Sequence, residues 1–119
     1  MTRNEEALQI EVAAFLDLAL PDEAVWWHTP NGGRRSISTA KRLKAMGVKG
    51  GIPDVLILYR ARLIGIELKS REGRASPAQK GMLPRLTQAG AVIGPLCRSL
   101  REVEAFLVQI IPLKGRIVA

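Results

Sequence analysis

Residues 51–69 read GIPDVLILYRARLIGIELK, and they set the architecture of the chain. Two apolar runs, residues 54–59 and 63–69, are separated only by the short Arg60-Ala61-Arg62 link. Apolar runs of this length joined so tightly predict an antiparallel hairpin. The glycines and proline of residues 50–53 predict a bend just before the first strand.

Two acidic residues lie in this hairpin at positions that otherwise favour apolar side chains. Asp54 begins the first run, and Glu67 lies inside the second with Lys69 two residues later. Side chains alternate along a strand, so Glu67 and Lys69 point the same way, and a hairpin brings Asp54 near them. Clustered carboxylates repel each other unless a cation lies between them, and hard oxygen ligands suit Mg²⁺ or Mn²⁺. The carbonyl of Leu68 is a further candidate oxygen ligand, and Lys69 is a candidate for orienting water or stabilising negative charge.

These residues also have an ordinary structural explanation. Pro-Asp starts many turns, and Glu-x-Lys is common on exposed strand faces. The preceding Gly-Gly-Ile-Pro bend, the two apolar strands and the basic chain favour a catalytic site over chance.

Helices and further strands are predicted on both sides of the hairpin. Capping signals and apolar spacing predict helices at 3–20, 38–46, 76–89 and 99–111, and strands at 25–29 and 91–96. This order predicts an α/β fold with a mixed sheet flanked by helices. With 119 residues, we expect a single domain over residues 1–119.

The chain is strongly basic, with 18 Lys and Arg against 11 Asp and Glu. Such an excess favours a polyanionic partner such as nucleic acid, and a solvated basic face is the simpler alternative. The candidate DNA-binding residues precede Asp54: Arg34, Arg35, Lys41, Arg42, Lys44 and Lys49. No apolar run approaches the length of a membrane helix, and the single cysteine excludes an internal disulfide, so we expect a cytoplasmic protein of a bacterium or a phage-infected host cell.

Several motifs together resemble the VRR-NUC family, the virus-type replication and repair nucleases of the PD-(D/E)xK superfamily. They are Gly51-Ile52-Pro53-Asp54, Glu67-Leu68-Lys69-Ser70, Gly73 to Gln79, Glu5 to Gln9 and Pro30 to Gly33. The resemblance covers residues 5 to about 107 and is closest to stand-alone phage and bacterial members.

This resemblance implies a restriction-endonuclease-like core, in which Asp54 and Glu67 bind the metal with the Leu68 carbonyl and Lys69 is the catalytic lysine. It also implies that a glutamate of the first helix, best matched by Glu5, completes the site, and that Gln79 lies at its edge. Both have a second reading, because Glu5 also follows Thr2, and Gln79 follows Ser76, at the spacing of a helix capping box.

The expected function is therefore a Mg²⁺- or Mn²⁺-dependent DNA endonuclease. The resemblance implies a repair-type homodimer that cuts branched DNA such as Holliday junctions or flaps, and a symmetric dimer matches a four-way junction. The alternatives are a non-catalytic nucleic-acid-binding module and a protein-interaction subunit. Of the remaining residues, His28 is expected to be a strand or interface residue, one of Trp26 and Trp27 to be exposed, and Cys97 to be a buried apolar residue.

Overall fold

The computed structural model of the chain describes residues 2–30 and 35–117. Within these residues the helices are α1 (Arg3–Ala19), α2 (Ile37–Ala45), α3 (Pro77–Gln88) and α4 (Leu100–Leu107). The strands are β1 (Val25–His28), β2 (Val55–Tyr59), β3 (Arg62–Ile66) and β4 (Val92–Ile93). The order of elements and the α/β class are as the sequence predicts.

The strands form one mixed sheet in the order β1-β2-β3-β4. The two pairs β1–β2 and β2–β3 are antiparallel, and β3 pairs with β4 in parallel. Tyr59 pairs with Arg62, so the hairpin turn contains only Arg60 and Ala61, one residue fewer than the expected link. Both turn residues have positive φ, 50° and 63°, as the tightest hairpin turns require.

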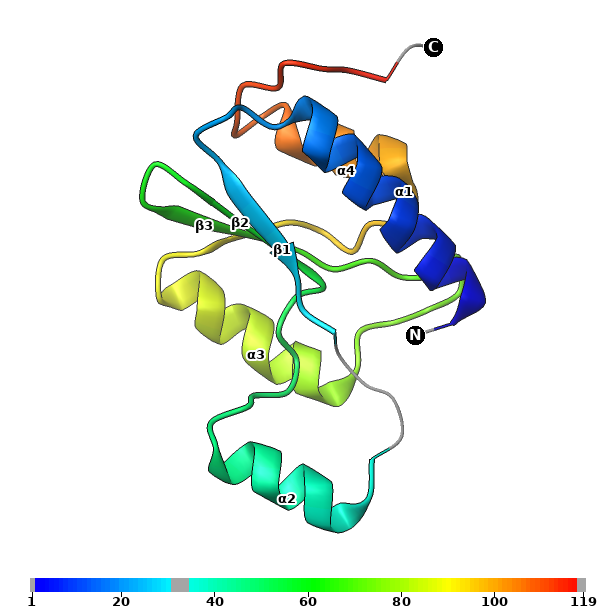
Figure 1. Ribbon diagram of the computed structural model, residues 1–119, viewed down its shortest axis with the longest axis vertical. Coiled ribbons are helices and arrows are strands. Elements are labelled where there is room, and N and C mark those ends of the chain that lie inside the picture. The colour runs from blue at the N-terminus through cyan, green and yellow to red at the C-terminus, as the bar shows by residue number, and fades with distance from the viewer. Residues whose placement is uncertain (1, 31–34, 118–119) are drawn as a thin grey trace.

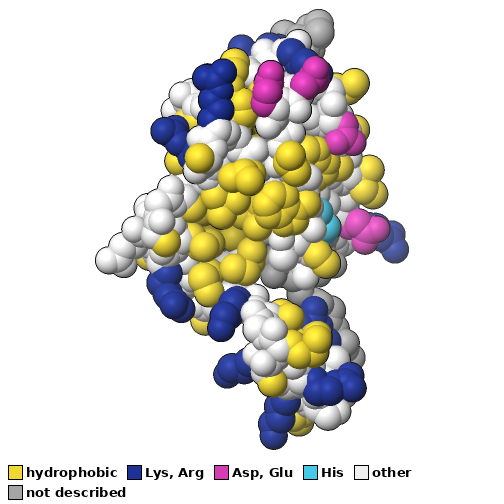
Figure 2. Space-filling view, turned by 60° about the vertical axis from the view of Figure 1, so that its left-hand side comes forward, with side chains coloured by type: hydrophobic (Ala, Val, Ile, Leu, Met, Phe, Trp, Pro, Cys, Tyr) yellow, Lys and Arg dark blue, Asp and Glu magenta, His cyan; other side chains and the backbone are white. Residues whose placement is uncertain are grey.

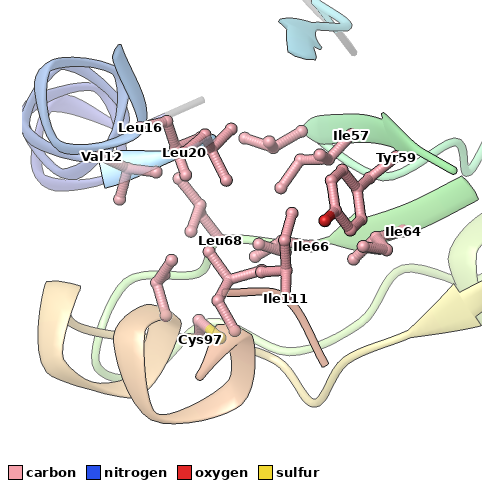
Figure 3. Packing of buried hydrophobic residues seen from close by; sticks show 13 residues of the cluster. Val12, Leu16, Leu20, Ile57, Tyr59, Ile64, Ile66, Leu68, Cys97 and Ile111 are labelled. Carbon is pink, nitrogen blue, oxygen red and sulfur yellow. The ribbon is translucent and has the colours of Figure 1, made fainter. Parts of the chain in front are cut away.

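Helices α1 and α4 cover one face of the sheet, and α3 lies against the other (Figure 1). The core between α1, α4 and the sheet includes Val12, Leu16, Ile57, Ile66 and Leu68, whose side chains converge in Figure 3. Because Ile66 and Leu68 point into this core, strand alternation turns Glu67 and Lys69 toward the opposite face. The same alternation places Asp54, which precedes the buried Val55, on that opposite face.

Three predicted boundaries were wrong for local reasons. Helix α2 begins earlier than predicted because Ser36, not Ser38, is its N-cap and accepts from the Thr39 amide at 3.1 Å. Strand β4 covers only Val92–Ile93, where a strand to 96 was predicted, since Pro95 has no N–H with which to continue the ladder. Helix α4 ends at Leu107 rather than near 111, and a turn after it carries Ile111 into the core.

Two parts of the surface stand apart from the core. Helix α2 projects from one end of the molecule and has no buried residue (Figure 1). On the sheet face opposite α1, Val25, Trp27 and Leu58 are exposed, and a continuous apolar patch covers the sheet in Figure 2. Trp26 points the other way and packs against the core, so one tryptophan of the pair is exposed, as predicted.

Among the described residues, no helix combines the length and apolarity required to cross a membrane.

Candidate active site

Asp54 and Glu67 lie side by side beneath the sheet surface and are 4% and 2% exposed. Asp54 directly precedes β2 and Glu67 directly follows β3, so the hairpin register brings the two carboxylates together. The Asp54 amide donates to Glu67 Oε1 at 3.0 Å, and the Leu68 amide donates to Asp54 Oδ2 at 2.9 Å. These reciprocal bonds fix both side chains against the backbone of the neighbouring strand end.

Lys69 and Gln79 approach the same carboxylate from two sides. Lys69 Nζ lies 3.4 Å from Glu67 Oε2, and Gln79 Nε2 donates to that oxygen. Gln79 is 5% exposed and also closes the predicted capping box, because its Oε1 accepts from the Ser76 amide at 2.9 Å. The two readings of Gln79 are therefore compatible, since one end of its amide caps α3 and the other holds Glu67.

A close approach of α3 to the hairpin makes the Gln79 contact possible. Gly51 has φ +80°, and a Cβ at this position would lie 2.3 Å from the Ala78 carbonyl oxygen. Only glycine tolerates both the conformation and the contact. The predicted bend before Asp54 therefore also sets the distance between α3 and the carboxylates.

The electrostatics of the pair favour a bound cation. Burial and, second to it, the nearby charge of Asp54 raise the pKa of Glu67 to about 7, although Lys69 acts in the opposite direction. Two adjacent buried carboxylates thus keep one proton near neutral pH unless a positive ion compensates both charges.

The residues at this position fit a small divalent ion. No group of three or more His, Cys, Asp or Glu side chains suited to a metal occurs in residues 2–30 and 35–117. Mg²⁺ does not require one, since it is usually bound by one or two carboxylates and retains several waters. Asp54 and Glu67 would hold the ion. The β-bridge between Leu68 and Cys97 uses the Glu67 carbonyl and the Lys69 amide, so the Leu68 carbonyl stays a candidate oxygen ligand.

Glu5 reaches the edge of this site from α1. The Glu5 amide donates to Thr2 Oγ1 at 3.1 Å, but the Glu5 carboxylate does not return to the cap. Its Oε1 instead accepts from the Ser70 amide at 3.1 Å, one residue beyond Lys69. Glu5 therefore contacts the strand end that carries the candidate catalytic residues, and no hydrogen bond joins it to Asp54 or Glu67 in the described part of the chain.

His28 is a neighbour of the site that the sequence did not assign to it. Its Nδ1 lies 2.8 Å from the carbonyl oxygen of Asp54, which also accepts from the Thr29 amide at 2.8 Å. A carbonyl can only accept, so Nδ1 carries the hydrogen in this contact. The register of β1 against β2 produces the contact, and no local sequence signal indicates that register.

The basic residues before Asp54 form a separate surface on and around α2. Arg35, Lys41, Arg42, Lys44 and Lys49 are all exposed, and none forms an ion pair within the described residues. Arg34 lies outside the described residues. A groove of about 430 Å³ runs between α2 and the end of β1 and is lined by Arg35, Lys44, Lys49 and Thr29 among others. Figure 2 shows Lys and Arg side chains around the lobe that α2 forms.

The groove adjoins the carboxylate pair through the backbone. Thr29, in its wall, donates its amide to the Asp54 carbonyl at 2.8 Å. The bend before Asp54 starts at Gly50. A Cβ added there would lie 3.5 Å from Ala78 Cβ, next to Gln79 in the first turn of α3. The basic surface and the acidic pair are thus distinct but adjacent.

Comparison with known proteins identifies the fold. No protein-family profile matches the chain, and no curated protein matches it either. One solved structure, named "VRR_NUC domain protein", is similar with a TM-score of 0.66 and 23% identity over 92% of this chain and 88% of that chain. A second, named "VRR_NUC domain", has a TM-score of 0.57 and 19% identity over 92% of this chain and 98% of its own. The chain therefore has the VRR-NUC domain fold, with a restriction-endonuclease-like core.

Proposed function

We propose that this protein is a metal-dependent DNA endonuclease that hydrolyses phosphodiester bonds. The observation that carries the proposal is the buried contact between Asp54 and Glu67, with Lys69 Nζ 3.4 Å from Glu67. Burial of two acids and an amine at the adjacent ends of paired strands destabilises the fold, because each charge loses hydration. A catalytic role accounts for keeping them there.

Each residue has a definable task in the reaction. Mg²⁺ or Mn²⁺ bound by Asp54 and Glu67 would polarise the phosphodiester and lower the pKa of a bound water. Lys69 is positioned to orient the attacking water or to stabilise the negative charge that develops on the phosphate. Gln79 holds Glu67 in place from α3, and Glu5 fixes the backbone just beyond Lys69.

DNA is the proposed substrate because the basic groove adjoins this centre. Exposed lysines and arginines without acidic partners gain by displacing counterions from phosphates. Arg35, Lys44 and Lys49 line the groove, and Lys41 and Arg42 lie on α2, the helix that carries Lys44. A helix of nine residues with no buried side chain has little intrinsic stability, so contact with a DNA backbone would stabilise it.

We further propose that the protein acts as a homodimer on branched DNA, such as a Holliday junction or flap. The exposed part of the sheet on β1 and β2 supports a second copy, because Val25, Trp27 and Leu58 expose 61%, 42% and 44% of their surface on these adjacent strands. A two-fold dimer would present two cutting sites to a symmetric junction. Light scattering should show a dimer for the wild type and a monomer for Trp27→Glu, whereas a monomeric wild type would contradict this arrangement.

The decisive test is cleavage of labelled four-way junction, flap and plain duplex DNA with Mg²⁺, Mn²⁺ or EDTA. Lys69→Ala and Asp54→Asn should each reduce the rate by about a hundredfold or more. Lys114→Ala is the matched control, because Lys114 pairs with the exposed Asp22 and such a surface pair contributes little. Salt-sensitive binding without cleavage on any substrate would instead establish a non-catalytic DNA-binding module.

A further inference from the structure

A second group of basic side chains lies on and beside the loop that follows Lys69. Arg71, Arg74 and Arg98 line a hollow of about 510 Å³ together with Glu72 and Gly73. Three arginines against one glutamate leave two net positive charges around it. All three arginines are exposed, so the hollow is accessible to a ligand from solvent.

The loop is held in one shape by side chains from other elements. Arg98 Nη1 lies 2.6 Å from both the Ser70 and Gly73 carbonyl oxygens and 3.3 Å from that of Arg71. From α1, Glu5 Oε1 accepts from the Ser70 amide, and Arg98 itself is held by α4, because its amide donates to Glu102 Oε2 at 2.7 Å. A loop fixed from both sides does not have to be ordered when it binds, which lowers the entropic cost of binding.

The arrangement of donors suits a phosphate group. Within the described residues, the side-chain hydrogen bonds of Arg98 all use Nη1, and its Nε and Nη2 form none. That edge of a guanidinium presents two parallel N–H groups, which match two oxygens of one phosphate. Arg71 and Arg74 surround the same hollow without an ion-pair partner among the described residues.

The location gives the ligand its identity. The loop begins two residues after Lys69 and contacts the first turn of α1, whereas α2 projects from the lower end of the molecule, beyond α3 (Figure 1). The carboxylate pair therefore adjoins two basic surfaces, the α2 groove through Thr29 and this loop through Lys69. A DNA strand held at the scissile phosphate would therefore pass close to both surfaces.

We propose that Arg71, Arg74 and Arg98 form a subsite for a backbone phosphate of the DNA, on the α1 side of the scissile bond. This inference rests on the proposed function, because it takes DNA as the substrate. The loop fixes the register of the strand across Asp54 and Glu67, and the α2 groove holds the other side.

The test is DNA binding measured by fluorescence anisotropy in EDTA, so that no cleavage is needed. The double variant Arg71→Gln/Arg74→Gln should bind about tenfold more weakly and lower the slope of log K against log salt by about one per arginine. The matched control is Arg62→Gln/Arg85→Gln, which removes the same charge at the start of β3 and in the last turn of α3. An equal change in both double variants would overturn the subsite, since it would mean that only net charge matters.

A second experiment replaces one backbone phosphate of the DNA at a time with a neutral methylphosphonate. It shows whether the subsite binds a phosphate of the DNA backbone or free phosphate. One position near the scissile bond should weaken wild-type binding but leave the double variant unaffected. No coupling at any position, or protection of the loop by inorganic phosphate alone, would overturn the proposal. Cleavage that depends on Lys69 is measured in a separate assay. If no such cleavage occurs but the coupling between the methylphosphonate and the double variant is intact, the nuclease is refuted and the subsite stands.

Discussion

Replacing Glu67 with glutamine should remove a pH dependence that this carboxyl imposes on the stability of the metal-free protein. Burial, reinforced by the charge of Asp54, raises the pKa of Glu67 from 4.5 to about 7. The folded protein therefore keeps a proton that the unfolded chain releases above about pH 4.5. The stabilising contribution of that proton is fully present below the unfolded pKa and is lost as the pH rises to about 7.

The magnitude follows from the two pKa values. A tenfold change in proton affinity corresponds to about 1.4 kcal/mol, so the full effect is about 3 kcal/mol. Between about pH 5 and about pH 8, the wild type should lose about 2–3 kcal/mol relative to Glu67→Gln. For a chain of this length that corresponds to a change of about 10 °C in the difference between their Tm values. Both oxygens of Glu67 accept a hydrogen bond, and a glutamine can accept only one of the two. The free-energy cost of the lost bond is the same at both pH values, so it cancels in the comparison.

The assay is urea unfolding of both proteins in EDTA at the two pH values. Glu11→Gln is the control, because Glu11 is an exposed carboxylate on α1 and its replacement should leave the wild-type pH profile unchanged. Parallel profiles for the wild type and Glu67→Gln would refute the reasoning, since they would mean that Glu67 is charged in the folded protein over this whole range.

Three further outcomes are expected. Mn²⁺ or Mg²⁺ should raise the Tm of the wild type at about pH 8 but not that of Asp54→Asn, as differential scanning fluorimetry would show; an equal rise in both would place the ion elsewhere. His28→Leu should lower kcat by about tenfold, and His28→Asn should retain most of the rate because its amide can donate to the Asp54 carbonyl, so equal rates for both variants would exclude a positioning role. Gly51→Ala should destabilise the fold by about 2 kcal/mol or more, because a Cβ would lie 2.3 Å from the Ala78 carbonyl oxygen. The control Gly81→Ala, where a Cβ on α3 meets nothing within 4 Å, should stabilise the fold by about 0.5–1 kcal/mol. The denaturant midpoints of both variants test this.

The central hairpin was predictable because its signals are local. Two apolar runs and a short link determine the β2–β3 pairing, and period-two alternation then places Glu67 and Lys69 on one face. The capping signals at Thr2, Ser76 and Ser99 likewise marked helix starts within one or two residues. Local hydrogen bonds satisfy such signals, so tertiary structure changes them little.

The helix and strand ends were less predictable because competing local signals lie within a few residues of one another. The pattern of residues 91–96 is that of a longer strand, yet only Val92–Ile93 pairs with β3. Helix α2 starts at Ser36 rather than Ser38, since either serine is a suitable cap by sequence and the local geometry decides between them.

The amino-acid sequence by itself determined the α/β class, the hairpin, and the convergence of Asp54, Glu67 and Lys69, because period-two alternation and turn length act over a few residues. Only the tertiary structure decided which distant groups complete that centre. It joined the Gln79 amide to Glu67, the His28 ring to the Asp54 carbonyl, and the Glu5 carboxylate to the Ser70 amide 65 residues away. Those contacts depend on how helices and strands pack against one another, and packing is set by the shape of the whole core rather than by neighbours along the chain.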